Sequence, residues 1–216
     1  MEQSTHQAKP AVTTEGIILK VENILSRLNP ATVFQKEQPI EVELGSGDGS
    51  FIAAYARAHP ESNFFAVERL LGRLRKIEKK AKRFGLSNIC GLRIEAGYFL
   101  DFLLPHPSAQ AIHVYFPDPW PKRKHRPNRL INEEFTVRCT RVLRPGGVVY
   151  LRTDDLDYFQ QMKRVFDANK NFQEVPTPES ISSFITDFER NFHTQGVPTL
   201  AAAYRLVAAS IDREEA

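Results

Sequence analysis

The chain has 216 residues, of which 42% are hydrophobic and 25% are charged, and its net charge is +3. This length suits one sizeable α/β domain, leaves little room for two, and carries the composition of a folded protein. No apolar run reaches the roughly 18 residues of a membrane span, and Cys90 and Cys139 form no CxxC pair, which excludes the usual zinc pattern and indicates a reducing, cytoplasmic location.

The predicted elements follow a polar N-terminal tail over 1–14, which lacks the apolar region of a signal peptide. Residues 15–28 have apolar side chains at helical spacing and predict an N-terminal helix. Further helices are predicted over 50–59, stopped by Pro60, over 70–85, with Gly85 as C-cap, and over 131–143. Short apolar runs predict strands at 40–44, 63–67, 88–94, 111–116 and 148–153.

The last forty residues change rhythm. They predict a helix over 184–192, a final edge strand within 201–209 and a C-terminal tail over 211–216. Strands that alternate with helices predict an α/β fold, a doubly wound, mostly parallel sheet with helices on both faces. We expect one domain over 15–210, with ligands beyond the carboxyl ends of its strands.

A glycine-rich turn follows the first strand of this predicted sheet. Gly45, Gly47 and Gly49 permit positive φ and close backbone approach, so we expect Gly45 and Gly47 to lie against a cofactor. The third glycine of a dinucleotide-binding fingerprint falls where Ser50 stands, and there is no Walker lysine. The turn alone is a weak signal, because tight strand-to-helix turns need glycine anyway.

Acidic residues at the strand ends narrow the choice of cofactor. Glu43 would repel a pyrophosphate and favours a cofactor with an ammonium group, while Glu68 is placed to accept both hydroxyls of a ribose. Either acid alone is more often a solvated strand-end residue. Together they predict a ligand such as S-adenosylmethionine, with Glu95 either near its adenine or in an exposed loop.

Residues 116–130, FPDPWPKRKHRPNRL, follow the fourth predicted strand. Pro117 and Pro119 fix the backbone around Asp118, so its carboxylate has little freedom. Trp120 either stacks on a base or packs the loop against the core. Positive charge is dense after it, and residues 69–83 form a second cationic run with eight Lys or Arg against Glu78. One such run is usually a solvated surface, but two on an otherwise acidic chain favour a nucleic-acid partner.

The motifs ELGSGDGSF, AVER, YFPDPWPKRKHRPNRL, LRTD and ITDFERNF, spread over roughly 35–207, resemble those of the bacterial tRNA (guanine-N7)-methyltransferase family. The resemblance implies the class I methyltransferase (Rossmann-like) fold, with seven strands of which the last is antiparallel. It also implies S-adenosylmethionine as cofactor, tRNA as partner, and the guanine at position 46 of the variable loop as target. The chain departs from the family at Pro127 and Asn128, and at Asn191, where basic residues are usual.

The resemblance also implies site residues. Those for the cofactor are Glu43, Glu68, Glu95 and Asp118, and those for the substrate are Lys122, Asp154, Thr186, Asp187, Phe188 and Glu189. Guanine N7 carries a lone pair and no proton, so the protein has to align the reactants and stabilise charge. We therefore expect Asp118 to be the catalytic residue, with Asp154 as second acid.

The base and the phosphates of the RNA have separate predicted contacts. Thr186 and Glu189 suit the guanine's Watson–Crick edge, although a helix cap is the competing interpretation for Thr186. Phosphate contacts are expected from the cations after Lys122, which are Arg123, Lys124, Arg126 and Arg129.

Other functions stay open. An exocyclic-amine nucleic-acid methyltransferase and a non-catalytic RNA-binding protein of the same fold are the alternatives, and Glu43 disfavours a dinucleotide oxidoreductase. No metal is expected, because His113 and His125 have no ligand spacing to other residues. The sequence leaves the oligomeric state open, whether monomer or homodimer.

Overall fold

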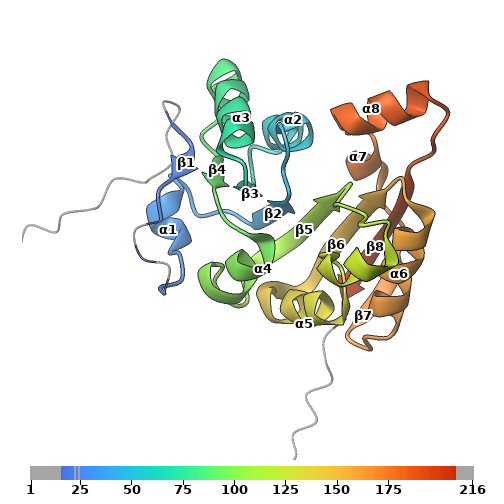
Figure 1. The fold of residues 1–216 in the computed structure, drawn as a ribbon. Coiled ribbons are helices and arrows are strands. Elements are labelled where there is room, and N and C mark those ends of the chain that lie inside the picture. The colour runs from blue at the N-terminus through green and yellow to red at the C-terminus, as the bar shows by residue number, and fades with distance from the viewer. Residues whose placement is uncertain (1–15, 22, 24, 208–216) are drawn as a thin grey trace, which may run out of the picture.

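The computed structural model describes residues 16–21, 23 and 25–207, and the predicted tails over 1–14 and 211–216 lie outside this part of the chain. Its secondary structure forms one mixed sheet between two layers of helices (Figure 1). The sheet has the order β1-β4-β3-β2-β5-β6-β8-β7. Its strands are β1 (Ile18–Leu19), β2 (Ile40–Leu44), β3 (Asn63–Val67), β4 (Ile89–Leu92), β5 (Ala109–Tyr115), β6 (Leu143–Thr153), β7 (Phe172–Val175) and β8 (Leu200–Leu206).

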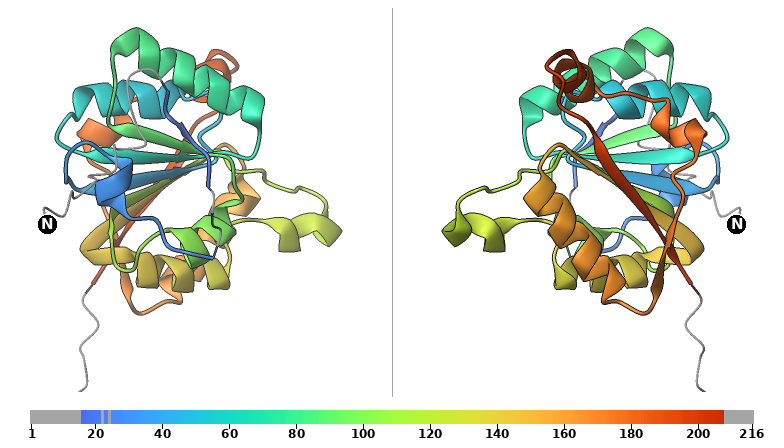
Figure 2. Two further views of the ribbon diagram at one scale, coloured as in Figure 1. Left: turned by 90° about the vertical axis from the view of Figure 1, so that its left-hand side faces the viewer. Right: turned by 90° about the vertical axis from the view of Figure 1, so that its right-hand side faces the viewer.

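The helices cover both faces of the sheet, as the sequence predicts. Figure 2 shows α2 and α3 on one face and α5 and α6 on the other. The helices are α1 (Pro30–Val33), α2 (Ser50–Ala58), α3 (Leu71–Phe84), α4 (Ala96–Tyr98), α5 (Glu133–Val142), α6 (Leu156–Asp167), α7 (Glu179–Ser182) and α8 (Asp187–Thr194). A π-helical turn spans Phe99–Leu103, and a 3-10 helix spans Arg123–Asn128.

The predicted helix over 15–28 is wrong. Ile18–Leu19 is instead a strand that pairs in parallel with β4, and the carbonyl of Ile17 accepts from the N–H of Gly91 at 2.8 Å. The Ile17 side chain is buried in the core. An edge of the sheet therefore offers these residues both backbone partners and apolar contact, which outweighs their helical spacing.

The C-terminal strand forms as predicted but is not an edge strand. β8 lies between β6 and β7 and runs antiparallel to both, whereas β7 occupies the edge. The seven strands β2–β8 match the number that the resemblance implies, and the two-residue β1 adds an eighth. β7 and α6 have no counterpart among the predicted elements.

The strands that carry the site are buried and in register. All residues of β2 and β3 are buried, as in parallel sheets with helices on both faces. Leu44 pairs with Val67 on one side and with Val114 on the other, so the carboxyl ends of β2, β3 and β5 lie side by side, along what we call the carboxyl edge of the sheet. The chain leaves β2 towards β3 on one side and β5 lies on its other side, which makes this edge a topological switch point where ligands bind.

Candidate active site

The glycine-rich turn after β2 has three glycines with positive φ, at 77° for Gly45, 55° for Gly47 and 78° for Gly49. A Cβ on Gly49 would lie 2.7 Å from Cγ1 of Ile77, so this glycine lets α2 pack against α3. Around Gly45 no atom lies within 4 Å of such a Cβ. The backbone at Gly45 therefore faces open space in which a ligand can approach it.

Glu43 lies beneath this turn and is only 4% exposed. Its Oε2 is the one buried side-chain polar atom without a hydrogen-bond partner in the described part of the chain. Burial raises the pKa of Glu43 from its usual value near 4.5 to about 8, although a hydrogen bond with Ser46 opposes the shift. A buried carboxylate with a free oxygen is a site for a hydrogen-bond donor or a cation.

Glu68 and Glu95 hold the loops that surround the turn. Glu68 Oε2 accepts from the N–H of Gly47 at 3.0 Å and Oε1 accepts from the N–H of Leu70 at 2.9 Å. Glu95 caps α4, because its two carboxylate oxygens accept from the N–H groups of Gly97 and Tyr98, each at 2.8 Å. Each carboxylate oxygen has a second lone pair, so these bonds leave capacity for a ligand.

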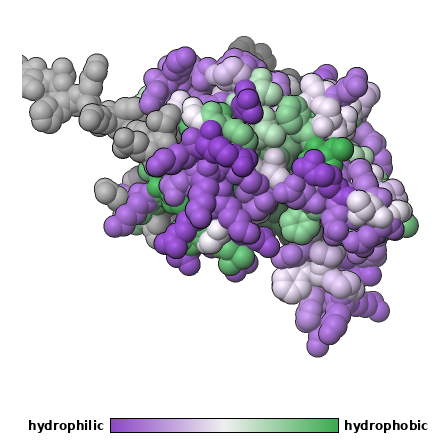
Figure 3. All heavy atoms as spheres, turned by 90° about the horizontal axis from the view of Figure 1, so that it is seen from above, coloured by the Kyte–Doolittle hydropathy of each residue, from purple (hydrophilic) through white to green (hydrophobic). Residues whose placement is uncertain are grey.

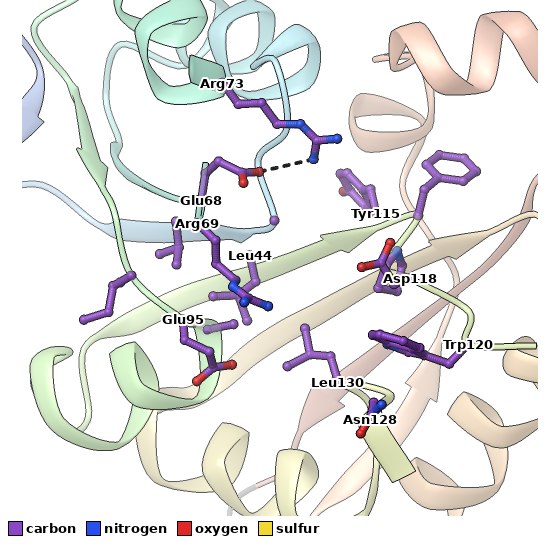
Figure 4. A pocket seen from close by; sticks show the side chains of 16 residues that line it. Leu44, Glu68, Arg69, Arg73, Glu95, Tyr115, Asp118, Trp120, Asn128 and Leu130 are labelled. Atoms are coloured by element: carbon purple, nitrogen blue, oxygen red, sulfur yellow. Dashed lines mark ion pairs between the residues drawn. The ribbon is translucent and has the colours of Figure 1, made fainter. Parts of the chain in front are cut away.

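A cleft lies along the carboxyl edge of the sheet, with a volume of about 250 Å³ in its main part. Figure 4 shows Glu68 and Glu95 on one side of it and Asp118 and Trp120 on the other. A second hollow of about 200 Å³ adjoins it and is lined by Glu43, Gly47 and Thr186 among others. Both are lined by Gly45, Arg73, Tyr115, Phe116 and Asp118. Asp118 therefore lies where the two hollows meet.

The backbone around Asp118 is strained on both sides. Phe116 has a φ of 50° and Trp120 a φ of 44°, the two positive values of residues other than glycine in the described part of the chain. Such a conformation costs a side-chain-bearing residue roughly 1–2 kcal/mol. The prolines predict a restrained Asp118, and the structure adds these two strained positions. Strain of this kind is concentrated at functional sites.

Arg129, which the sequence predicts to contact RNA, instead holds the same loop through buried contacts in this structure. It is 2% exposed, and its guanidinium donates to the carbonyl of Pro119 at 2.7 Å, to Asp157 Oδ2 at 2.6 Å and to Gln161 Oε1 at 2.9 Å. A guanidinium with these partners is unavailable to phosphate. The sequence could not show this, because Asp157 and Gln161 lie on α6.

Residues 121–128, here named the basic arm, project from the body of the molecule (Figure 2). Lys122, Arg123 and Lys124 are exposed, whereas Arg126 forms an ion pair with Asp157 Oδ1 at 3.0 Å. Trp120, at the base of the arm, lines the cleft and makes an edge contact with the His125 ring at 5.8 Å between ring centroids. Its indole is therefore part of the cleft wall.

The C-terminal candidates divide into two groups. Thr186 and Phe188 line the hollow beside Glu43, and Phe188 is 52% exposed. Glu189 is 4% exposed and lines neither hollow, and its contact with a guanine edge stays a prediction. In this structure Glu189 completes a capping box with Thr186: Thr186 Oγ1 accepts from the Glu189 N–H at 3.0 Å, and Glu189 Oε2 accepts from the Thr186 N–H at 3.2 Å.

The remaining predicted substrate residues lie farther from the cleft. Asp187 is exposed, and its carboxylate pairs with Arg190 at 2.8 Å. Lys122 on the arm and Asp154 after β6 line neither hollow. The cleft and the adjoining hollow thus bring together residues from segments far apart in the sequence, which are Glu43, Glu68, Glu95, Asp118, Thr186 and Phe188.

Two buried residues of the site escape the sequence reading. Arg152, on β6, donates to Glu189 and to the carbonyls of Ile181 and Phe184, and its guanidinium carbon lies 4.4 Å from the centre of the Tyr115 ring. Tyr115 lines both hollows, and burial raises the pKa of its hydroxyl well above the usual value. In the sequence, each of the two is recognisable only as a polar side chain within a mainly apolar strand.

His113 holds Tyr115 from the interior of the sheet. Its Nε2 lies 2.8 Å from Glu41 Oε2, and its Nδ1 lies 2.8 Å from the Tyr115 hydroxyl. Because a carboxylate only accepts, Nε2 carries the hydrogen of the bond to Glu41. His113 is thus a buried structural residue. Within the described ranges, no three His, Cys, Asp or Glu side chains are grouped to hold a metal.

Comparisons with known proteins agree with this architecture. A family model described as "Putative methyltransferase" matches residues 37–202. The tRNA (guanine-N(7)-)-methyltransferase of Rhodopirellula baltica is 31% identical over 217 residues, which cover 91% of this chain and 76% of that protein. The protein of the same name from Nitrosococcus oceani is 34% identical over 170 residues, covering 78% and 72%.

Among solved structures, that of the 16S rRNA methyltransferase KamB superposes with a TM-score of 0.60 at 16% identity, over 84% of this chain and 95% of that one. At this identity the likeness shows the fold, which is the class I methyltransferase fold. The family model and the relatives extend over most of the chain, including the strand ends that line the cleft. The chain therefore belongs to the tRNA (guanine-N7)-methyltransferase family.

Proposed function

We propose that this chain transfers a methyl group from S-adenosylmethionine to N7 of a guanine in tRNA, at position 46 of the variable loop. The observation that carries the proposal is the unpartnered Oε2 of Glu43, buried at one end of a cleft that also holds Asp118. The relatives named above support tRNA as the substrate. Position 46 rests on the resemblance of the motifs alone.

The residues of the cleft fit S-adenosylmethionine. Glu43 would accept from its ammonium group, which would also supply the cation that this buried carboxylate lacks. The open space at Gly45 would let the backbone approach the ligand. Glu68 would accept from the ribose hydroxyls with its remaining lone pairs, and Glu95 lies on the same wall. When bound, S-adenosylmethionine supplies an electrophilic methyl group.

The guanine requires positioning and not deprotonation. Its N7 carries a free lone pair, so no side chain has to remove a proton for the transfer. Asp118 is exposed at the junction of the two hollows and is held by Pro117 and Pro119. A fixed carboxylate there would stabilise the positive charge that the imidazole ring of the base gains on methylation.

The other residues would contact different parts of the RNA, according to where they lie relative to the cleft. Thr186 and Phe188 are at the cleft and would contact the base, whereas Glu189 supports Thr186 from behind. Lys122, Arg123 and Lys124 on the basic arm would contact phosphates, with Arg126 beside them. The positive charges of the basic arm would offset the repulsion between the backbone phosphates and the carboxylates in the cleft. Asp154 and Asp187 would contact the substrate outside the two hollows.

The test is methyl transfer from labelled S-adenosylmethionine to an unmodified tRNA transcript, followed by mass analysis of the nucleosides. We expect 7-methylguanosine, and its loss when the variable-loop guanine is replaced by adenine. A methyl group on an exocyclic amine would replace the proposal by the alternative of another nucleic-acid methyltransferase. Binding of RNA without any transfer would favour the non-catalytic alternative.

A further inference from the structure

The surface of α3 and the residues just before it carry a cluster of basic side chains, most of which lie outside the site described above. We name it the α3 basic face; its exposed members are Arg69, Arg73, Arg75, Lys76, Lys79, Lys82 and Arg83. Among these residues Arg73 forms an ion pair, with Glu68 at 3.7 Å, and Glu78 is the one acid within α3. The others form no ion pair with any described residue. Unneutralised like charges on one helix repel one another, so this face suits an anionic partner.

The α3 basic face is directed away from the core. Leu74, Ile77 and Ala81 pack inwards and are fully buried. Arg73, Lys76 and Arg83 recur at intervals of three and seven residues, which puts them along one side of the helix. The 14 residues of α3 span about 21 Å, enough to follow several nucleotides of an RNA strand.

One end of this face is part of the cleft wall. Arg69 and Arg73, at the start of α3, line the main cleft, and Figure 4 shows them across from Trp120 and Asn128 at the base of the basic arm. The cleft itself holds the carboxylates of Glu68, Glu95 and Asp118. Seen from above, hydrophilic side chains dominate the surface, and hydrophobic ones gather mainly near its middle (Figure 3). Cationic surfaces thus flank an acidic cleft on two sides.

We propose that the α3 basic face binds the phosphate backbone of the substrate RNA. An RNA that crosses the cleft would contact α3 on one side and the basic arm on the other, with the target base between them. This inference rests on the proposed function, because it takes the substrate to be tRNA. It adds a second phosphate-binding surface to the one that the arm supplies.

The test compares two triple variants with the unaltered chain. Lys76→Gln, Lys79→Gln and Arg83→Gln remove three cations of the α3 basic face without touching the cleft lining. Lys36→Gln, Arg144→Gln and Lys170→Gln form the control, since these residues are exposed, form no ion pair with described residues and lie near the amino ends of β2, β6 and β7. Both sets remove three charges. The measurement is tRNA affinity as a function of salt concentration.

The α3 variant should bind tRNA roughly tenfold more weakly near physiological salt, with the slope of log affinity against log salt flatter by about 2. The control should keep the slope of the unaltered chain. The two variants should keep the thermal midpoint and the affinity for S-adenosylmethionine.

An unchanged slope in the α3 variant, or an equal change in the control, would overturn this inference. If the unaltered chain methylates tRNA and the slope stays the same, only the α3 basic face is excluded. If the unaltered chain transfers no methyl group to tRNA, the proposed function itself fails.

Discussion

Arg152 Nη1 donates to the buried Oε2 of Glu189 at 3.0 Å, and these two residues lie 37 positions apart in the sequence. Both side chains are almost completely buried. The same guanidinium binds the carbonyls of Ile181 and Phe184. Arg152 thus holds the segment from α7 to α8 against β6. This segment contains Thr186 and Phe188, which line the hollow beside Glu43.

Removal of Arg152 should therefore destabilise the protein. Arg152→Leu leaves the Glu189 carboxylate and two carbonyls buried without their partner, and loss of one member of a buried ion pair costs about 3–5 kcal/mol. Denaturant unfolding measures the change. Arg190→Leu is the control, because Arg190 pairs with Asp187 at the surface, where such a pair contributes less than about 1 kcal/mol. Equal losses in the two variants would contradict the role of Arg152.

The raised pKa of Glu43 predicts a pH dependence of stability. Its pKa is about 8 in the fold and near 4.5 when unfolded, so the folded state binds the additional proton between these values. The contribution is fully present below pH 4.5 and is lost as the pH rises through 8. Glu43→Gln should remove this component, so that the variant is more stable than the unaltered chain at pH 8 but not at pH 4.5.

Urea unfolding of both proteins at a series of pH values, without cofactor, is the measurement. A constant difference across this range would contradict the pKa assignment. The same variant should bind S-adenosylmethionine more weakly, by roughly tenfold or more, because an amide cannot pair with an ammonium group as a carboxylate does. Calorimetric titration checks this second expectation separately.

Asp118→Asn should lower the turnover number by at least about a hundredfold, which corresponds to about 2.7 kcal/mol of barrier. The amide has the size of the carboxylate but no charge to stabilise the methylated base. The affinity for tRNA should stay within a few-fold, since the phosphate contacts are elsewhere. Single-turnover transfer with saturating tRNA measures the effect, and an unchanged rate would exclude Asp118 as the catalytic residue.

Gly45 and Gly49 provide a matched pair, because their φ angles of 77° and 78° are nearly equal. Alanine at either position carries the same backbone strain, about 1 kcal/mol. At Gly49 the new Cβ also collides with Ile77, which should add roughly 1–3 kcal/mol. Gly45→Ala should mainly weaken cofactor binding. Unfolding and cofactor titration of the two variants separate these effects, and equal stability would contradict the packing argument.

Local signals in the sequence predict much of the sheet. The strands at 40–44 and 63–67 have the predicted bounds. Residues 64–67 form the continuous apolar run of a fully buried parallel strand, whereas Glu41 and Glu43 alternate with the apolar residues of 40–44. Gly85 is the predicted C-cap of α3, with a φ of 65° and its N–H directed to the carbonyls of Ala81 and Lys82. Each of these features depends on residues close together in the chain.

The sequence expectations differ from the structure where distant residues decide the outcome. Residues 16–21 have helical spacing, yet their partner is Gly91 on β4. Glu189 and Arg129 carry the charges expected of substrate contacts. Their side chains are buried, and they form ion pairs with Arg152 and Asp157 respectively. The position of Asp118 is predictable because its own prolines restrain it. The orientation of a long charged side chain depends on partners that the sequence does not identify.

The position of β8 has a consequence for synthesis of the protein. β7 pairs only with β8 in the described structure, and β6 also needs β8 to cover its open side. A nascent chain that has reached residue 199 therefore exposes two strand edges, and its substrate-facing segment with Thr186 and Phe188 is tethered at one end alone. The site can close only when the last strand enters the gap between β6 and β7. An incomplete chain would thus be prone to aggregation at those edges, and the site becomes competent only after β8 has been synthesised.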